Sequence, residues 1–113
     1  MTQEEKDLLL QDLCARLPYG VILNCCDAVG EKLTAIDENG LINHDYDIDE
    51  VKPYLFPLSS MTEEQKIRIC ALQDMGLSYY HLIIDHYNEW HLDYRGLIEK
   101  GLAIDATGLN IYG

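Results

Sequence analysis

The chain has 113 residues, of which 20 are acidic and 8 are basic, so its formal net charge is −12 at pH 7. This balance argues against a surface that binds nucleic acid or an anionic bilayer, because both contacts depend on Lys and Arg. Hydrophobic residues make up 48% of the sequence, which is enough to bury a core. The length fits one compact domain over residues 1–113.

The first residues predict a helix that ends before Pro18. Thr2 and Glu5 have the spacing of a capping box, in which each residue bonds the backbone amide of the other. The residue before a proline avoids the helical region, so residues 17–20 are expected to form an exit turn. An apolar stripe at helical spacing comprises Leu9, Leu10, Leu13, Cys14 and Leu17.

A small antiparallel β-meander is predicted to follow the helix. Its short apolar segments are flanked by turn residues and cover 21–26, 33–37 and 41–42. Residues 27–32 are expected to form a loop, and Asn39 with Gly40 tolerates the positive φ angles of a tight hairpin. A sheet this small needs a helix on one face, and the N-terminal helix is the candidate.

Residues 51–58 contain two prolines, which forbid a long helix, so we expect an extended and partly buried crossing. Thr62 and Gln65 form a second capping box for a helix that stops at Gly76. Its apolar positions are Ile67, Cys70, Ala71 and Met75.

Ser78 is expected to cap a third helix that runs to about His91. One face of this helix would carry Tyr79, Leu82, Ile83, His86 and Trp90, and the other His81, Asp85, Asn88 and Glu89. Asp93 would cap a short fourth helix ending at Gly101, with Leu97 and Leu102 in contact. Residues 102–104 are expected to add an edge strand, and residues 105–113 a loosely held tail. The predicted fold class is therefore α+β, with about three helices in the C-terminal part.

The cysteines favour a reducing, cytoplasmic setting. Cys14, Cys25, Cys26 and Cys70 show no CxxC spacing, and a vicinal pair seldom closes a disulfide without strain. The N-terminal residues carry acids where a secretory signal carries positive charge. No apolar run reaches the roughly 18 residues that a membrane span requires.

Two segments have carboxylates at spacings that cations use. Residues 44–50 alternate acids as calcium loops do, but Glu50 stands where such a loop needs Gly, and Phe56 where it needs Glu. His81, Asp85 and Glu89 recur every four residues and would line one helix ridge. A solvated acidic loop and a solvated helix face are the simpler interpretations of these patterns.

No sequence motif indicates catalysis or a cofactor. The chain lacks a GxSxG elbow, an HExxH pair and a glycine-rich phosphate loop. The eight tyrosines and one tryptophan fit core packing or a protein interface, since amphipathic aromatic side chains supply contact area. Arg16 and Arg95 are expected to anchor carboxylates or carbonyls within the protein.

Three blocks of sequence resemble a family of small uncharacterised proteins encoded by gut anaerobes and their phages or prophages. The blocks are DLCARLPYGV, VKPYL with PLSSMTEE, and DYRGLIEKGLA, and they cover about a third of the chain. Members of that family often have Arg where this chain has Phe56. The resemblance implies an intracellular setting and transfers no mechanism. It also implies a shared structural junction made of Arg16, Tyr19, Tyr54, Ser59, Ser60, Asp93, Tyr94 and Arg95.

Together these features favour a small acidic interaction module that binds another protein. The alternatives are a metal- or thiol-dependent enzyme, which the absence of motifs makes less favoured, and a structural subunit of a larger assembly.

Overall fold

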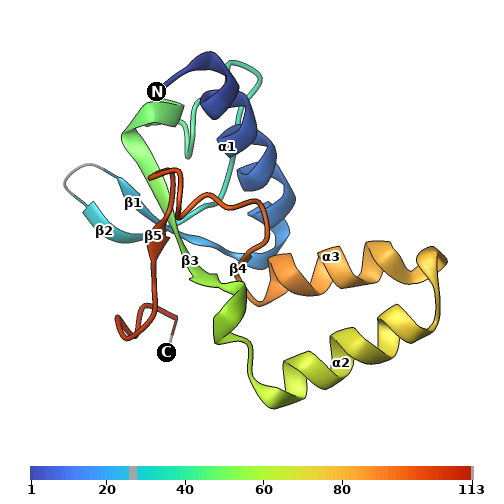
Figure 1. Ribbon diagram of the computed structural model, residues 1–113. Helices are drawn as coiled ribbons and strands as arrows, with labels where there is room; N and C mark the ends of the chain where they lie inside the picture. The colour runs from blue at the N-terminus through green and yellow to red at the C-terminus, as the bar shows by residue number, and fades with distance from the viewer. Residues whose placement is uncertain (26–27, 113) are drawn as a thin grey trace.

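The computed structural model describes residues 1–25 and 28–112, with the side chains of residues 28 and 29 left out (Figure 1). It is mixed α+β, with an N-terminal helix, a five-stranded sheet and two further helices. No helix within the described residues has both the length and the apolar character needed to cross a membrane.

Helix α1 (Gln3–Arg16) begins with the predicted capping box. The amide of Glu5 donates to Thr2 Oγ1 at 3.1 Å, and the amide of Thr2 donates to Glu5 Oε1 at 2.9 Å. A 3-10 turn over Leu17–Tyr19 follows the helix. Gly20, with φ of 68°, redirects the chain into the sheet.

The predicted apolar stripe of α1 faces the core except at Cys14, with Leu10 and Leu17 half-buried against the core. Leu9 and Leu13 are buried as expected, but Cys14 is exposed. Asp12 and Arg16 are buried instead, because their opposite charges pair with each other inside the protein.

The sheet is mixed rather than a simple antiparallel meander. Strands β1 (Ile22–Cys25), β2 (Ala28–Lys32) and β3 (Val51–Pro57) pair in the antiparallel order β2-β1-β3. Strands β4 (Leu92–Asp93) and β5 (Ile104–Asp105) both pair with β3 in the parallel sense. The expected extended crossing at 51–58 is thus the central strand of the sheet.

The second predicted strand is misplaced in the sequence. Residues 28–32, expected as loop, form β2, whereas 33–37 and 41–42 form only isolated bridges through Ile36 and Ile42. The Asn43 side chain explains the difference, because its amide group takes the place of a strand ladder. Its Oδ1 accepts from the amides of Thr34 and Ala35 at 2.7 and 3.2 Å, and its Nδ2 donates to the Lys32 carbonyl at 2.9 Å. The expected end of the first strand at Cys26 lies outside the described residues.

A tight turn forms at the predicted place, over residues 37–40; Gly40 has the expected positive φ, but Asn39 does not. Gly40 has φ of 79°, and its amide donates to the Asp37 carbonyl at 2.9 Å. Asp37 Oδ1 accepts from the amides of Asn39 and Leu41, and these hydrogen bonds lower the pKa of the Asp37 carboxyl.

The main core lies between α1 and the sheet, as predicted. Its fully buried members are Leu9, Leu13, Val21, Leu23, Cys25, Leu33, Ile42, Val51, Leu55, Leu97, Leu102 and Ala103. This core draws on residues from both ends of the chain, so the C-terminal segment is part of the same packing unit.

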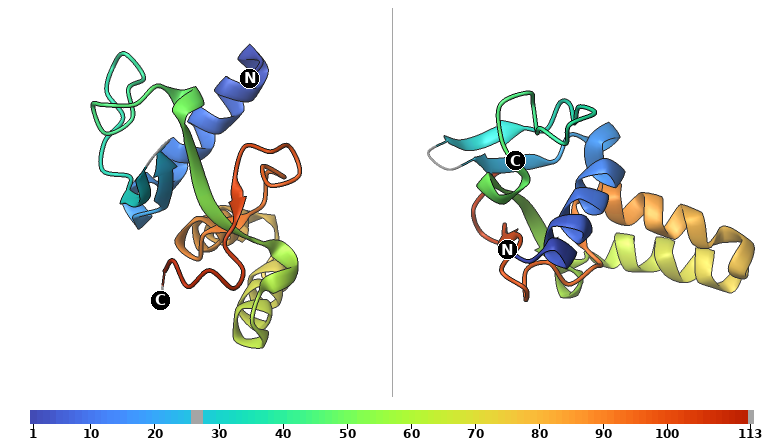
Figure 2. Two further views of the ribbon diagram at one scale, coloured as in Figure 1. Left: turned by 90° about the vertical axis from the view of Figure 1, so that its left-hand side faces the viewer. Right: turned by 90° about the horizontal axis from the view of Figure 1, so that it is seen from above.

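Helices α2 (Glu63–Asp74) and α3 (Tyr80–Glu89) pack side by side and project away from the sheet (Figures 1 and 2). We call residues 63–89 the arm. Thr62 and Gln65 form the predicted capping box of α2, and Gly76, with φ of 104°, follows its end. The expected Ser78 cap of α3 is wrong, because a 3-10 turn over Leu77–Tyr79 leads directly into the helix.

The predicted fourth helix is a single turn. Asp93 caps it as expected, because its carboxylate accepts from the amides of Leu97 and Ile98, both at 2.9 Å. The amide of Leu102 donates to the Leu97 carbonyl at 2.9 Å, which closes the expected Schellman arrangement at once. The helix ends at Gly101 as predicted but begins late, because Leu92 and Asp93 pair with β3 and Gly96, with φ of 74°, is not helical. The C-terminal part therefore contains two α-helices rather than three.

Specific contacts attach the segment after residue 104 that we expected to be loosely held. The amide of Ala106 donates to the Leu55 carbonyl at 2.8 Å, and the Ala106 side chain is buried. Tyr112 Oη donates to the Tyr54 carbonyl at 2.8 Å and accepts from the amide of Ile22 at 2.9 Å. These bonds hold the tail across β1 and β3.

Candidate functional site

A buried charge network joins α1 to the base of the arm. Asp12 and Arg16 are both 0% exposed, and Arg16 Nε donates to Asp12 Oδ2 at 2.7 Å. Arg16 Nη2 donates to the Leu92 carbonyl at 2.6 Å. Arg95 Nε donates to the other carboxylate oxygen of Asp12 at 3.1 Å. One carboxylate therefore binds two guanidinium groups, as we expected for both arginines.

Tyr94 completes this network. Its ring centroid lies 5.3 Å from the guanidinium carbon of Arg16 and 4.9 Å from that of Arg95, within cation–π range. Tyr94 Oη accepts from Arg95 Nη2 at 3.1 Å and donates to Oδ1 of Asn88 at 3.0 Å. Asn88 was predicted on the solvent side of its helix, but it is buried, and the hydrogen bond from Tyr94 satisfies its side-chain oxygen. The network fixes α3 to the body of the protein.

The structure brings together only part of the junction that the resemblance implies. Arg16, Tyr94 and Arg95 share the buried network, and Asp93 caps the adjacent turn. Tyr54 belongs to the tail contact, because its carbonyl accepts from Tyr112 Oη. Its own Oη accepts from Asn24 Nδ2 at 3.0 Å, within the sheet. The remaining members are Tyr19, half-buried, and Ser59 and Ser60, both exposed.

Ser59 and Tyr94 line one surface hollow together with Asp93, Gly96 and Glu99. Ser60 Oγ donates to the Pro57 carbonyl at 2.7 Å, which stabilises the turn between β3 and α2. Among the described residues, the lining of this hollow contains neither histidine nor cysteine.

His91 and Tyr112 stack with ring centroids 3.9 Å apart. Burial, together with the nearby Arg16 charge, lowers the pKa of His91 to about 4, and burial raises the pKa of Tyr112 to about 12. Both side chains are consequently neutral at pH 7, and His91 is a poor general base there. His91 Nδ1 is buried and has no hydrogen-bond partner within the described residues.

The ridge of His81, Asp85 and Glu89 is exposed along α3. Glu89 Oε1 lies 3.3 Å from Nδ1 of His86, a contact within the same helix. Among the residues that the structure describes, the ligand atoms of His81, Asp85 and Glu89 do not converge within 4.8 Å of one another.

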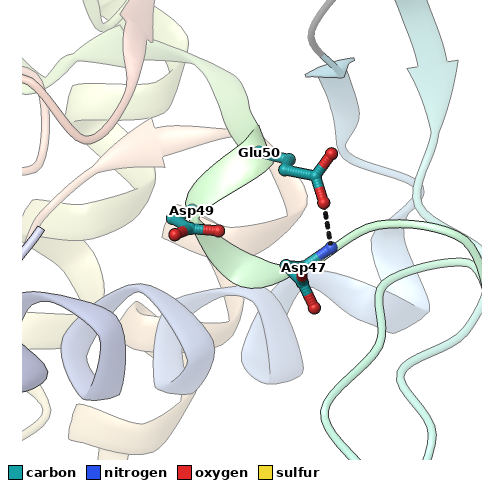
Figure 3. Close-up of side chains that lie close together, drawn as sticks. All are labelled: Asp47, Asp49 and Glu50. Carbon is teal, nitrogen blue, oxygen red and sulfur yellow. Dashed lines mark hydrogen bonds between the residues drawn. The ribbon is translucent and has the colours of Figure 1, made fainter.

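The acidic residues of the 44–50 segment do converge. Carboxylate oxygens of Asp47, Asp49 and Glu50 lie within 4.8 Å of one another, all on exposed side chains (Figure 3). The amide of Asp47 donates to Glu50 Oε1 at 3.0 Å, as part of a capping box around the 3-10 turn Ile48–Glu50. The capping box accounts for the proximity of Asp47 and Glu50, and three exposed carboxylates do not by themselves define a cation site.

The arm has a separate apolar core and an apolar outer surface. Its core comprises Ile69, Leu72 and Ile83, with partly buried Met61, Leu82, Tyr87 and Trp90 around them. Five of the eight large hydrophobic side chains that are exposed in the described chain lie between residues 67 and 80; they are Ile67, Met75, Leu77, Tyr79 and Tyr80. Leu77, at the tip, is 91% exposed.

The predicted apolar positions of α2, which are Ile67, Cys70, Ala71 and Met75, are all exposed, because the helix has apolar residues on two faces and the other face packs against α3. Ile69 and Leu72 form the face toward α3, whereas Ile67, with 67% exposure, and Met75, with 60%, face solvent. Either set has helical spacing. A surface hollow lies at the tip of the arm, where α2 leads into α3. Its lining residues are Gln73, Gly76, Leu77, Tyr80 and Ile83.

No protein-family model, curated protein or solved structure matches the chain. Its function is therefore argued from its own residues.

Proposed function

We propose that the protein is an interaction module and that the arm is its contact surface for another protein. The observation that carries the proposal is the group of exposed apolar side chains on residues 67–80, with Leu77 at 91% exposure. Large exposed apolar patches on soluble proteins often mark protein–protein interaction sites.

The buried charge network supports this function because it holds the arm in place. Arg16 bonds the Leu92 carbonyl just beyond α3, and Tyr94 bonds Asn88 within it. A rigidly held arm loses little conformational freedom when it binds, which favours association. The exposed side chains themselves are dispensable for packing of the arm, since its core consists of Ile69, Leu72 and Ile83.

The setting that we propose is the cytoplasm of a gut anaerobe, in phage or prophage biology, as the sequence resemblance implies. Exposed thiols at Cys14 and Cys70 are compatible with a reducing compartment. The acidic surface fits a protein partner better than nucleic acid, since phosphate contacts need basic groups.

The test is capture of proteins by the immobilised chain from a lysate of a native host. Leu77→Glu removes apolar surface at the tip, and Leu109→Glu is the matched control because Leu109 is 50% exposed outside the arm. A partner that is captured by the native chain and by Leu109→Glu, but lost with Leu77→Glu, supports the proposal. Capture that is unaffected by Leu77→Glu overturns it.

A further inference from the structure

We infer that the partner of the arm is a second copy of this chain, an inference that rests on the proposed function. The contact would be an antiparallel pairing of α2 with its symmetry mate. Two arms, each two helices thick, would then form a four-helix arrangement that covers their apolar outer faces.

The outer face of α2 is self-complementary. Ile67, Ala71 and Met75 are spaced four residues apart, so they form one stripe, and all three are exposed. Ile67 and Met75 lie at equal distances along the helix from Ala71. An antiparallel two-fold axis at Ala71 therefore sets Ile67 of one copy against Met75 of the other. The small Ala71 side chain lets the two helices approach closely at the axis.

Charge favours this segment over the rest of the surface as the contact between copies. Residues 67–84 contain one basic residue, Arg68, and one acidic residue, Asp74, so the remainder of the chain carries the whole net charge of −12. Arg68 and Asp74 are also equally spaced from Ala71. Antiparallel pairing puts unlike charges at the same level along the helices and like charges at opposite ends.

The exposed apolar side chains of the arm supply part of the area that a dimer needs. A large aromatic side chain covers roughly 150 to 250 Å² when it is buried, and a standard interface needs about 800 Å² from each partner. The exposed fractions of Ile67, Met75, Leu77 and Tyr80 are 67%, 60%, 91% and 59%. These side chains alone supply several hundred Å² from each copy.

The first experiment measures the mass of the purified chain by sedimentation from about 1 µM to about 1 mM, a range that spans weak to moderate affinities. We expect a monomer–dimer equilibrium whose dissociation constant rises roughly tenfold or more in Ile67→Glu and in Met75→Glu, because each buries charge in place of apolar surface. Leu109→Glu should leave it unchanged. Circular dichroism verifies that each variant is folded.

The effect of salt on affinity distinguishes a second copy of this chain from a basic partner. Pairing of two chains of charge −12 strengthens as salt screens their repulsion. Binding to a basic partner weakens under the same conditions. Dimerisation that weakens with added salt therefore contradicts the inference.

A cross-link tests the position of the axis. Ala71→Cys, made in a Cys14→Ser and Cys70→Ser background, should form an intermolecular disulfide under mild oxidation, since the two thiols meet at the axis. Asp85→Cys in the same background is the control, because Asp85 is exposed on α3 away from this stripe. Equal cross-linking of the two variants overturns the proposed geometry.

The outcomes separate the two proposals. A chain that stays monomeric at every concentration, while Leu77→Glu still abolishes capture from lysate, overturns the self-pairing and leaves the proposed function standing. A dimer that tolerates Ile67→Glu, Met75→Glu and Leu77→Glu alike shows that another surface makes the contact between copies, and overturns the self-pairing. Capture from lysate that is also unaffected by Leu77→Glu would in addition overturn the proposed function.

Discussion

The two halves of the buried ion pair should contribute unequally to stability. We expect Asp12→Ala to lower the free energy of unfolding more than Arg16→Met. Asp12 is the single carboxylate that receives Nε of both Arg16 and Arg95. Removing it leaves two guanidinium groups beside the Tyr94 ring without their counter-charge. Removing Arg16 leaves Asp12 still paired with Arg95.

The magnitudes follow from burial. Loss of one partner of a buried pair costs about 3–5 kcal/mol, and Asp12→Ala belongs in this range because Arg16 is 0% exposed. Arg16→Met should cost about 1–3 kcal/mol, mainly because the Leu92 carbonyl loses its donor. Ala and Met are both good helix formers, so helix propensity adds little to either value. The larger loss is a major part of the roughly 5–15 kcal/mol available to a domain.

The assay is urea unfolding at pH 7, followed by circular dichroism for the whole chain and by fluorescence of Trp90 for the arm. The double variant Asp12→Leu with Arg16→Met should recover part of the loss seen in Asp12→Ala, since it removes one of the unpaired charges. If Arg16→Met costs as much as Asp12→Ala, or more, the carboxylate is not the centre of the network.

Three further expectations concern the tail and the tip. The free energy of unfolding should fall by about 1–2 kcal/mol as pH drops from about 6.5 to about 4, because unfolded His91 binds a proton before the folded side chain does. His91→Asn, which tolerates the local φ of 57°, should flatten that part of a pH–stability curve. Tyr112→Phe should cost about 1–2 kcal/mol in urea unfolding, because it removes the bonds to Tyr54 and Ile22; no measurable loss would mean that the tail is not held. Leu77→Glu should change thermal stability by less than about 0.5 kcal/mol, since the side chain is 91% exposed.

Local signals in the sequence were sufficient for the starts of α1 and α2 and for the turn before Leu41, but not for the start of α3. Thr2 with Glu5 and Thr62 with Gln65 are reciprocal hydrogen-bonding pairs within four residues, and both form as predicted. The Asn39-Gly40 turn depends on backbone freedom at a single glycine. Such features need no distant contact, so the sequence alone determines them.

The partners in the sheet and the buried face of each helix depended on the tertiary structure. Strand β2 replaced the predicted 33–37 strand because the Asn43 side chain bonds the backbone on both sides of Leu33. The fourth helix stayed a single turn because Leu92 and Asp93 pair with β3 and Gly96, with φ of 74°, delays its start. In each case a contact from outside the segment itself outweighed local propensity.

The candidate site divides in the same way. The sequence by itself determined the acidic balance and the absence of catalytic motifs. It also singled out Arg16 and Arg95 as anchors within the protein. Only the tertiary structure decided that Arg16 and Arg95 share Asp12, which is 83 residues from Arg95. It also decided that Ile69 and Leu72 face α3, so that Ile67 and Met75 are left exposed. Helical periodicity fixes which residues share a face, but the element that packs against the helix determines which face is buried.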